Sequence, residues 1–267
     1  MITLNNINLS SIDLSGIDLR GIKLGLGGRG GGSGDGFPQL PGDVTRWHFG
    51  GLTNEMMAAM DDPRIEDADH KGRFLSFKNF AWKEGSGISD VYPGALVFDG
   101  VDDYGVCDNF PILTKEKGYT VVALRQWDQD FLNTTLTGGL LSTRNYSTGE
   151  GVAFEKIESS SKGYWNLGAG GIIDFAKSPF TWQTSKQYNN VGILKGDKNH
   201  GKPLCVGCGL SGGQQCGRFA IWELVILDHD ATEEELTKIK DYFVKTYPWL
   251  FFDQAWTVTG KTNEAED

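Results

Sequence analysis

Apolar residues follow two different patterns in this chain. Near the N-terminus an isoleucine returns every fifth residue and a leucine follows two places later, which gives ten apolar positions: Ile2, Leu4, Ile7, Leu9, Ile12, Leu14, Ile17, Leu19, Ile22 and Leu24. Helices repeat apolar residues every three to four positions and strands every two, so a strict five fits neither element. From about residue 95 onward, by contrast, short apolar runs are separated by Gly, Asn, Asp or Ser.

This second pattern predicts an all-β fold. Runs such as ALVFDG, YTVVALRQW and RFAIWELVILDH are rich in β-branched and aromatic residues, and turn residues bound each run. Regular short strands of this kind are typical of an antiparallel sandwich or barrel. The dipeptide Asp99-Gly100 stands between two runs and predicts a tight hairpin turn, because such turns need positive φ angles.

One helix is predicted over residues 232–247. Thr232 is placed as the N-cap and Glu235 as its capping-box partner three residues later. Pro248 ends the segment. Four apolar residues fall on one face of this helix, which we expect to pack on the sandwich: Leu236, Ile239, Phe243 and Tyr247.

Glycine divides the chain into segments. The stretch GLGGRGGGSGDG at 25–36 predicts a flexible tether. WTVTGKTNE at 256–264 shares Trp, Gly, Thr, Asn and Glu with WHFGGLTNE at 47–55, at equal spacing, and this repeat predicts the start of a second similar module. We therefore expect four segments: a pentad-repeat β anchor for oligomerisation (1–26), a linker (27–42), one sandwich (43–250), and a second module or tail (251–267).

The net charge of the chain argues against one class of binding partner. The chain holds 25 basic and 35 acidic residues, a formal charge of -10, which repels a phosphate backbone and argues against nucleic acid. No run reaches the roughly 18 to 20 apolar residues that span a bilayer, and no basic and apolar leader opens the chain. We expect no membrane insertion and synthesis in a cytoplasm without export.

The segments after the tether resemble the LamG, or concanavalin A-like, jelly-roll superfamily. The resemblance lies in WHFGGLTNE, GRFLSFKNFAW, LVFDGVDDY, GYTVVALRQW and GRFAIWELVILDHDATEEELTKIKDYF, which occur in the order that the family shows. It implies two antiparallel sheets, and in many members glycan or protein binding. Some relatives hold calcium with loop carboxylates, which would be Asp99, Asp102 and Asp103 here. The alternative places Asp99 in a hairpin turn and the other two in solvent.

The sequence indicates no enzyme. Glycoside hydrolases of this fold place their carboxylates in a strand pattern that is missing here, and Glu155 and Glu158 point to opposite faces of a strand. Cys205, Cys208 and Cys216 suggest zinc, with His200 as a fourth ligand, but cysteine is also a common buried residue in strands. Apart from this and calcium, no cofactor is expected.

Aromatic residues are the candidates for contact with sugars. Stacking on a sugar would need a ring at a sheet surface or loop tip, whereas most aromatic residues of a sandwich belong to its core. The candidates are Trp127, Tyr164, Trp165 and Trp182.

The pentads resemble the pentapeptide-repeat family, whose coils stack into a four-sided β-helix. Isoleucine replaces the small residue of that family at one inward position, and five pentads make little more than one coil. Ordering about 25 residues costs on the order of 25 to 50 kcal/mol. Full burial of the ten side chains returns roughly 15 to 30 kcal/mol. The segment therefore needs a partner, either two more copies of itself or another protein.

The whole layout resembles head or tail fibre proteins of tailed phages that infect gut Bacteroidetes. We expect a structural virion protein, a head fibre rather than a tail fibre and a homotrimer. It would attach to capsid or other virion proteins by its N-terminus and display lectin-like domains toward a host-surface glycan. The alternatives are a bacterial surface adhesin and a carbohydrate-binding module of a glycan-degrading system.

Overall fold

The computed structural model describes most of the region that the sequence assigns to the sandwich. The described residues are 36–111, 113, 117–134, 136–143, 153–156, 162–164, 172–174, 179–185, 203–210 and 213–251. The five pentads, most of the glycine tether and the repeated WTVTGKTNE segment lie outside these ranges. The anchor and the second module stay predictions.

The first sheet, sheet A, is built around one long strand. Its order is β12 (Phe180–Thr184), β7 (Thr120–Trp127), β16 (Arg218–Leu227), β5 (Leu96–Asp99) and β4 (Gly87–Ile88). A sixth strand, β1 (Val44–His48), also pairs with β16. The N-terminal half of β16 pairs with β5 and its C-terminal half with β1, and all these pairings are antiparallel.

The second sheet, sheet B, follows a longer path. Its order is β11 (Ile172–Asp174), β10 (Lys162–Tyr164), β9 (Ala153–Lys156), β8 (Gly138–Ser142), β13 (Leu204–Val206), β6 (Tyr104–Cys107), β3 (Phe74–Lys78) and β2 (Arg64–Glu66). The hairpin of β14 (Cys208–Leu210) and β15 (Gln214–Cys216) joins it through a parallel contact between β15 and β8. The all-β prediction is confirmed.

The main core lies between the two sheets. Alternate residues of each strand enter it, as Val121 and Ala123 do in β7, while Val122 and Leu124 between them belong to a second apolar cluster. Sheet B contributes side chains such as Leu75 to the main core. Both faces of β7 are therefore buried.

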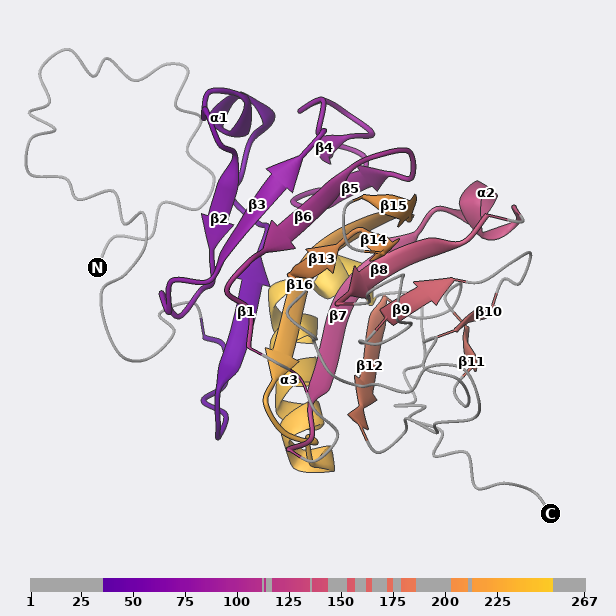
Figure 1. Cartoon of the computed structure of the whole chain (residues 1–267). Helices are drawn as coiled ribbons and strands as arrows, with labels where there is room; N and C mark the ends of the chain where they lie inside the picture. Colours follow the sequence, from indigo (N-terminus) through magenta and orange to yellow (C-terminus); the bar gives the residue numbers. More distant parts are fainter. Residues whose placement is uncertain are drawn as a thin grey trace, which may run out of the picture.

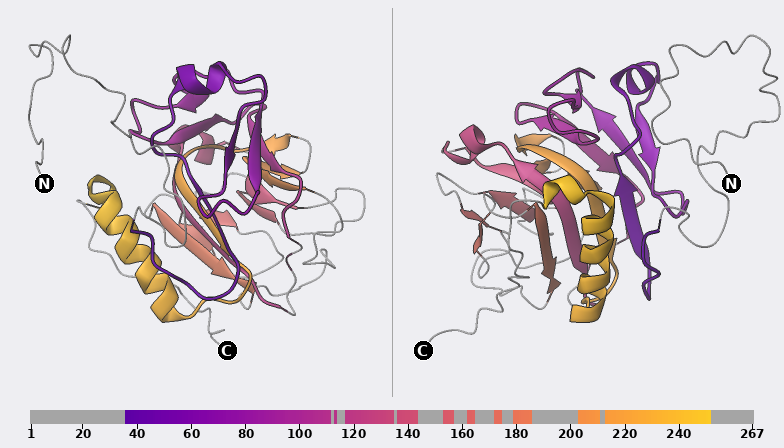
Figure 2. Two further views of the ribbon diagram at one scale, coloured as in Figure 1. Left: turned by 90° about the vertical axis from the view of Figure 1, so that its left-hand side faces the viewer. Right: turned by 180° about the vertical axis from the view of Figure 1, so that it is seen from behind.

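The second cluster lies between sheet A and helix α3 (Glu233–Thr246), which runs along the outer face of the sheet (Figures 1 and 2). The predicted capping box of Thr232 and Glu235 is present, and Leu236, Ile239 and Phe243 are buried. The helix prediction is thus confirmed. Two short helices, α1 (Asn54–Ala58) and α2 (Gln129–Leu132), and one 3-10 turn, η4 (Pro248–Leu250), complete the described helices. None of them is long and apolar enough to cross a membrane.

The predicted hairpin at Asp99-Gly100 is wrong. Strand β5 pairs with β16 and β4 in sheet A, whereas β6 pairs with β3 and β13 in sheet B. Gly100 has φ +77°, as a tight turn requires, and a Cβ there would lie 2.8 Å from Arg218 Cβ. The turn therefore carries the chain from one sheet to the other, at an end of the sandwich.

Candidate functional site

Three aspartates gather at this crossover between the sheets. One carboxylate oxygen from each of Asp99, Asp102 and Asp103 lies within 4.8 Å of the others. Asp99 Oδ1 accepts hydrogen bonds from the backbone N–H groups of Val101 (2.7 Å) and Asp102 (3.3 Å). This carboxylate therefore shapes the turn in the way that aspartate side chains often do.

Asp103 is the buried member of the group. Its side chain is fully buried, Oδ1 accepts from Ser86 Oγ at 3.0 Å, and Oδ2 accepts from the Asp99 backbone N–H at 3.0 Å. Burial raises the pKa of Asp103 to about 6, and the nearby charges of Asp99 and Asp102 act in the same direction. The alternative that placed Asp103 in solvent is wrong, while Asp102 is exposed as it stated.

The aspartates meet only part of what calcium needs. Calcium takes six to eight oxygen ligands, and closely spaced carboxylates are suitable ones. Both oxygens of Asp103 and one of Asp99 already accept hydrogen bonds that hold the crossover. A structural role is thus evident from the contacts, and calcium remains a prediction.

The three cysteines Cys205, Cys208 and Cys216 form a small buried cluster beside Tyr104 and Val106. The hydrogen bond with Cys205, together with burial, raises the pKa of Cys208 far above the usual range of a thiol. Burial raises the pKa of Cys216 to about 11, and the charges of the three aspartates add to this. Buried thiols of raised pKa are unreactive, which fits a structural role for this cluster.

The three thiols do not form a ready-made zinc site. Among the described residues, the aspartates are the single set of three whose ligand atoms approach one another closely enough for one ion. His200, the fourth ligand that the sequence suggested, lies outside the described ranges.

Of the four predicted sugar-stacking residues, the structure describes the side chains of Trp127 and Trp182. Trp127 is 3% exposed and stacks on Phe131, with ring centroids 5.7 Å apart, so the core covers it. Trp182 is half-buried and packs against the apolar cluster beneath α3. Tyr164 ends β10, but its side chain lies outside the described part, as does all of Trp165.

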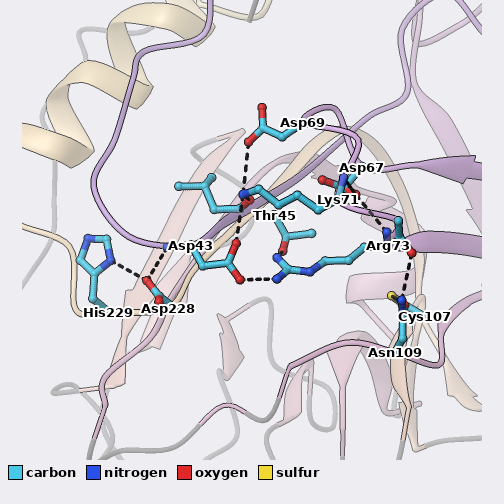
Figure 3. A network of polar contacts seen from close by, with 12 residues as sticks. Asp43, Thr45, Asp67, Asp69, Lys71, Arg73, Cys107, Asn109, Asp228 and His229 are labelled. Atoms are coloured by element: carbon cyan, nitrogen blue, oxygen red, sulfur yellow. Dashed lines mark hydrogen bonds and ion pairs between the residues drawn. The ribbon is translucent and has the colours of Figure 1, made fainter. Parts of the chain in front are cut away.

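The N-terminal entry to the sandwich is tied down by charges (Figure 3). Asp43, just before β1, forms ion pairs with Arg73 and with Lys71, whose Nζ lies 3.0 Å from Asp43 Oδ1. Its backbone N–H donates to Asp228 Oδ1 at 2.9 Å, and His229 Nδ1 lies 3.2 Å from the same oxygen. Partial burial raises the pKa of Asp43, but its bonds to Arg73 and Lys71 outweigh this and hold the pKa below its usual range.

A second polar network, which the sequence did not suggest, lies between sheet A and α3. Its centre is Glu223 of β16, which is fully buried. Glu223 Oε2 lies 3.2 Å from Arg46 Nη1, and Glu223 Oε1 accepts from the hydroxyls of Tyr242 and Tyr247, both at 2.8 Å. His48 Nδ1 lies 3.1 Å from the same Oε1. One buried carboxylate thus joins β1, β16, α3 and the residue after α3.

This network reaches the surface at Trp249. The Trp249 ring lies edge to face with Tyr247, with centroids 5.7 Å apart and an interplanar angle of 76°, and its side chain is 48% exposed. The one available sequence signal was a tryptophan directly after Pro248, where the predicted helix ends. No sequence motif pointed to the partners of Glu223, because Arg46 lies 177 residues away from it along the chain.

No family model and no curated protein matches the sequence. Solved structures of Trypanosoma rangeli sialidase have a weak similarity to the fold of this chain. The complex with sialic acid is 11% identical, with a TM-score of 0.43. The match covers 76% of this chain and 33% of the sialidase chain. The complex with the inhibitor DANA is 13% identical, with a TM-score of 0.42. The match covers 73% of this chain and 32% of the sialidase chain. This chain therefore spans about a third of the sialidase structures that it matches.

These matches correct one expectation from the sequence. We expected a protein without enzymatic activity, and the matching structures are those of sialidases, one of them a covalent intermediate with 2,3-difluorosialic acid. The expectation that the chain is not an enzyme is therefore contradicted and is not kept. TM-scores of 0.42 to 0.44 assign neither a reaction nor a catalytic residue to this chain.

Proposed function

We propose that this chain is a virion fibre protein, a head fibre of a tailed phage, whose sandwich is a LamG-type jelly roll that adheres to a host-surface glycan. The pentads would join three copies and attach them to capsid or other virion proteins. The two-sheet architecture and the helix packed on sheet A agree with such a domain, and the phage context rests on the sequence resemblance.

The observation that carries the proposal is the fixed entry to the sandwich. A displayed domain must keep its orientation relative to its anchor, so the chain should enter the domain at a rigid point. Asp43 provides one, because ion pairs join it to Lys71 and Arg73, just before β3, and its backbone N–H donates to Asp228, just after β16. An anchor before residue 36 would therefore transmit force to strands of both sheets.

Removal of residues 1–26 tests the anchor. We expect the truncated chain to be a monomer by mass photometry and to be absent from assembled particles, while its melting temperature stays within about 2 °C of the full chain. A full-length variant with Ser10 and Ser11 exchanged for threonine is the matched control, since it keeps the ten Ile and Leu residues. Trimers or normal incorporation into particles after truncation would contradict the proposal.

Adhesion is tested separately on the full chain. Binding to host cells and to immobilised host polysaccharide should be measured with and without excess soluble polysaccharide, and release of monosaccharide should be followed in the same samples. Competition by the polysaccharide supports glycan adhesion. Binding that only a protease treatment of the cells removes would point to a protein receptor instead.

A further inference from the structure

We propose that Trp249, together with His48, forms a binding site for a neutral pyranose ring. This inference rests on the glycan adhesion proposed above and names the place and the ligand class. None of the aromatic residues suggested by the sequence belongs to this site.

Trp249 is an exposed ring held in a fixed position. It is 48% exposed, whereas Tyr247 and Phe251, two positions before and after it, are 4% and 9% exposed. The turn η4 between them is closed by backbone bonds from Leu250 N to Tyr247 O (3.1 Å) and from Phe251 N to Pro248 O (3.0 Å). Two buried rings thus anchor the turn that presents the indole, which lowers the entropic cost of binding.

The indole of Trp249 is about half exposed. Its ring contact among the described residues is the edge-to-face one with Tyr247. The other exposed aromatic side chain among the described residues, Phe74, has the guanidinium of Arg64 over its ring at 4.8 Å. Trp249 is therefore the better stacking surface of the two.

His48 supplies a polar group that contacts the same Tyr247 ring as Trp249 does. The rings of His48 and Tyr247 are 6.4 Å apart, and the imidazole is 35% exposed. His48 Nδ1 lies 3.1 Å from Glu223 Oε1 and 3.0 Å from the Tyr247 hydroxyl, so these two partners occupy the Nδ1 side of the ring. A ligand would then meet the other ring nitrogen, Nε2.

Gly50 keeps the Nε2 edge of His48 uncovered. A Cβ on Gly50 would lie 2.6 Å from His48 Nε2 and 2.8 Å from His48 Cε1. Any side chain at this position would therefore occupy the space beside the imidazole. Gly50 has no positive φ, so alanine there would not strain the backbone, but its Cβ would force the His48 ring to shift.

These groups match a sugar ring rather than another small ligand. A pyranose has an apolar face of C–H groups that stacks on an aromatic ring, and hydroxyl groups at its edge that can donate to or accept from a ring nitrogen such as Nε2. A neutral sugar fits better than an anionic one, because the chain carries a charge of -10 and Glu223 lies directly beneath His48. One or two rings would bridge Trp249 and His48 across Tyr247.

The test uses the full chain on a printed array of neutral hexose and N-acetylhexosamine oligosaccharides with sialylated counterparts. We expect Trp249→Ala to weaken binding to neutral glycans by about tenfold or more, as truncated tryptophan anchors often do. Trp249→Phe should weaken it less, and Gly50→Ala should weaken it by roughly threefold to tenfold. Leu136→Ala, which removes an exposed apolar side chain between α2 and β8, should leave binding unchanged.

Each outcome separates the two proposals. If the wild-type chain binds neither glycans nor cells, both are overturned. If it binds glycans and the Trp249 and Gly50 variants bind equally well, adhesion stands and this site is wrong. A preference for sialylated glycans, or a change of oligomeric state in Trp249→Ala with unchanged binding, also overturns this site. Melting temperatures verify folding, and Gly50→Ala keeps the test valid if Trp249→Ala unfolds.

Discussion

Two buried carboxylates hold this sandwich together in different ways. Asp103, at the crossover between the sheets, accepts hydrogen bonds within the described residues from two neutral groups, Ser86 Oγ and the Asp99 N–H. Glu223, between sheet A and α3, has the guanidinium of Arg46 at 3.2 Å in addition to two tyrosine hydroxyls and His48. The difference teaches that a buried acid can be held by neutral donors alone, as Asp103 is with its raised pKa, or by a cation as well, as Glu223 is.

The largest effect is expected from Glu223→Gln. This change leaves Arg46 buried without its carboxylate and disturbs the bonds of Tyr242 and Tyr247. Breaking a buried ion pair costs about 3 to 5 kcal/mol, which urea unfolding followed by tryptophan fluorescence would measure. The double variant Arg46→Met with Glu223→Gln should recover part of this loss. A loss below about 1 kcal/mol in the single variant would show that the pair contributes little.

A smaller effect is expected from the pH dependence of Asp103. Its pKa is raised to about 6 in the folded protein, above the value near 3.8 of an unfolded aspartate, so the folded state holds the proton more tightly. Its contribution to stability is therefore full below about pH 4 and is lost as the pH rises through 6. The loss should amount to roughly 1 to 3 kcal/mol.

The variant Asp103→Asn isolates this contribution. It keeps the size of the side chain and cannot titrate, so its free energy of unfolding should change less between pH 4 and 7 than that of the wild type. Urea unfolding at several pH values would measure this. Asp102→Asn, which alters the exposed neighbour, is the matched control. Equal pH profiles for wild type and Asp103→Asn would contradict the raised pKa.

The smallest effect is expected from calcium. If the crossover aspartates bind it, about 10 mM calcium should raise the free energy of unfolding by roughly 1 to 2 kcal/mol, as for a weak extracellular site. The gain should be greater at pH 7 than at pH 5, because Asp103 must lose its proton. Magnesium at the same concentration is the control. An unchanged melting temperature would exclude the site, and a response retained in Asp103→Asn would place it elsewhere.

Local patterns predicted the elements of this fold better than their connections. The capping box of Thr232 and Glu235 and the apolar spacing of Leu236 and Ile239 are properties of one short segment, so α3 was predictable. The dipeptide Asp99-Gly100 correctly predicted a turn. The prediction that this turn joins two paired strands was wrong, because β5 and β6 belong to different sheets. Turn chemistry depends on a few backbone angles, whereas the choice between two sheets depends on distant strands.

The candidate sites were less predictable than the fold. The three aspartates are close in the sequence, so their proximity in space was expected. The sugar candidates were chosen by residue type, and Trp127 is instead part of the core. Trp249 is distinguished by exposure and by its neighbours, which are set by how α3 packs on sheet A.

The sequence by itself determined the strand-rich composition, the position of α3 and the turn at Gly100, because short-range hydrogen bonding and side-chain periodicity decide these features. Only the tertiary structure decided that β5 and β6 belong to different sheets, that Asp103 is buried, and that Glu223 joins Arg46, His48 and two tyrosines. The physical reason is that burial and ion pairing depend on residues brought together from distant parts of the chain, as Arg46 and Glu223 are.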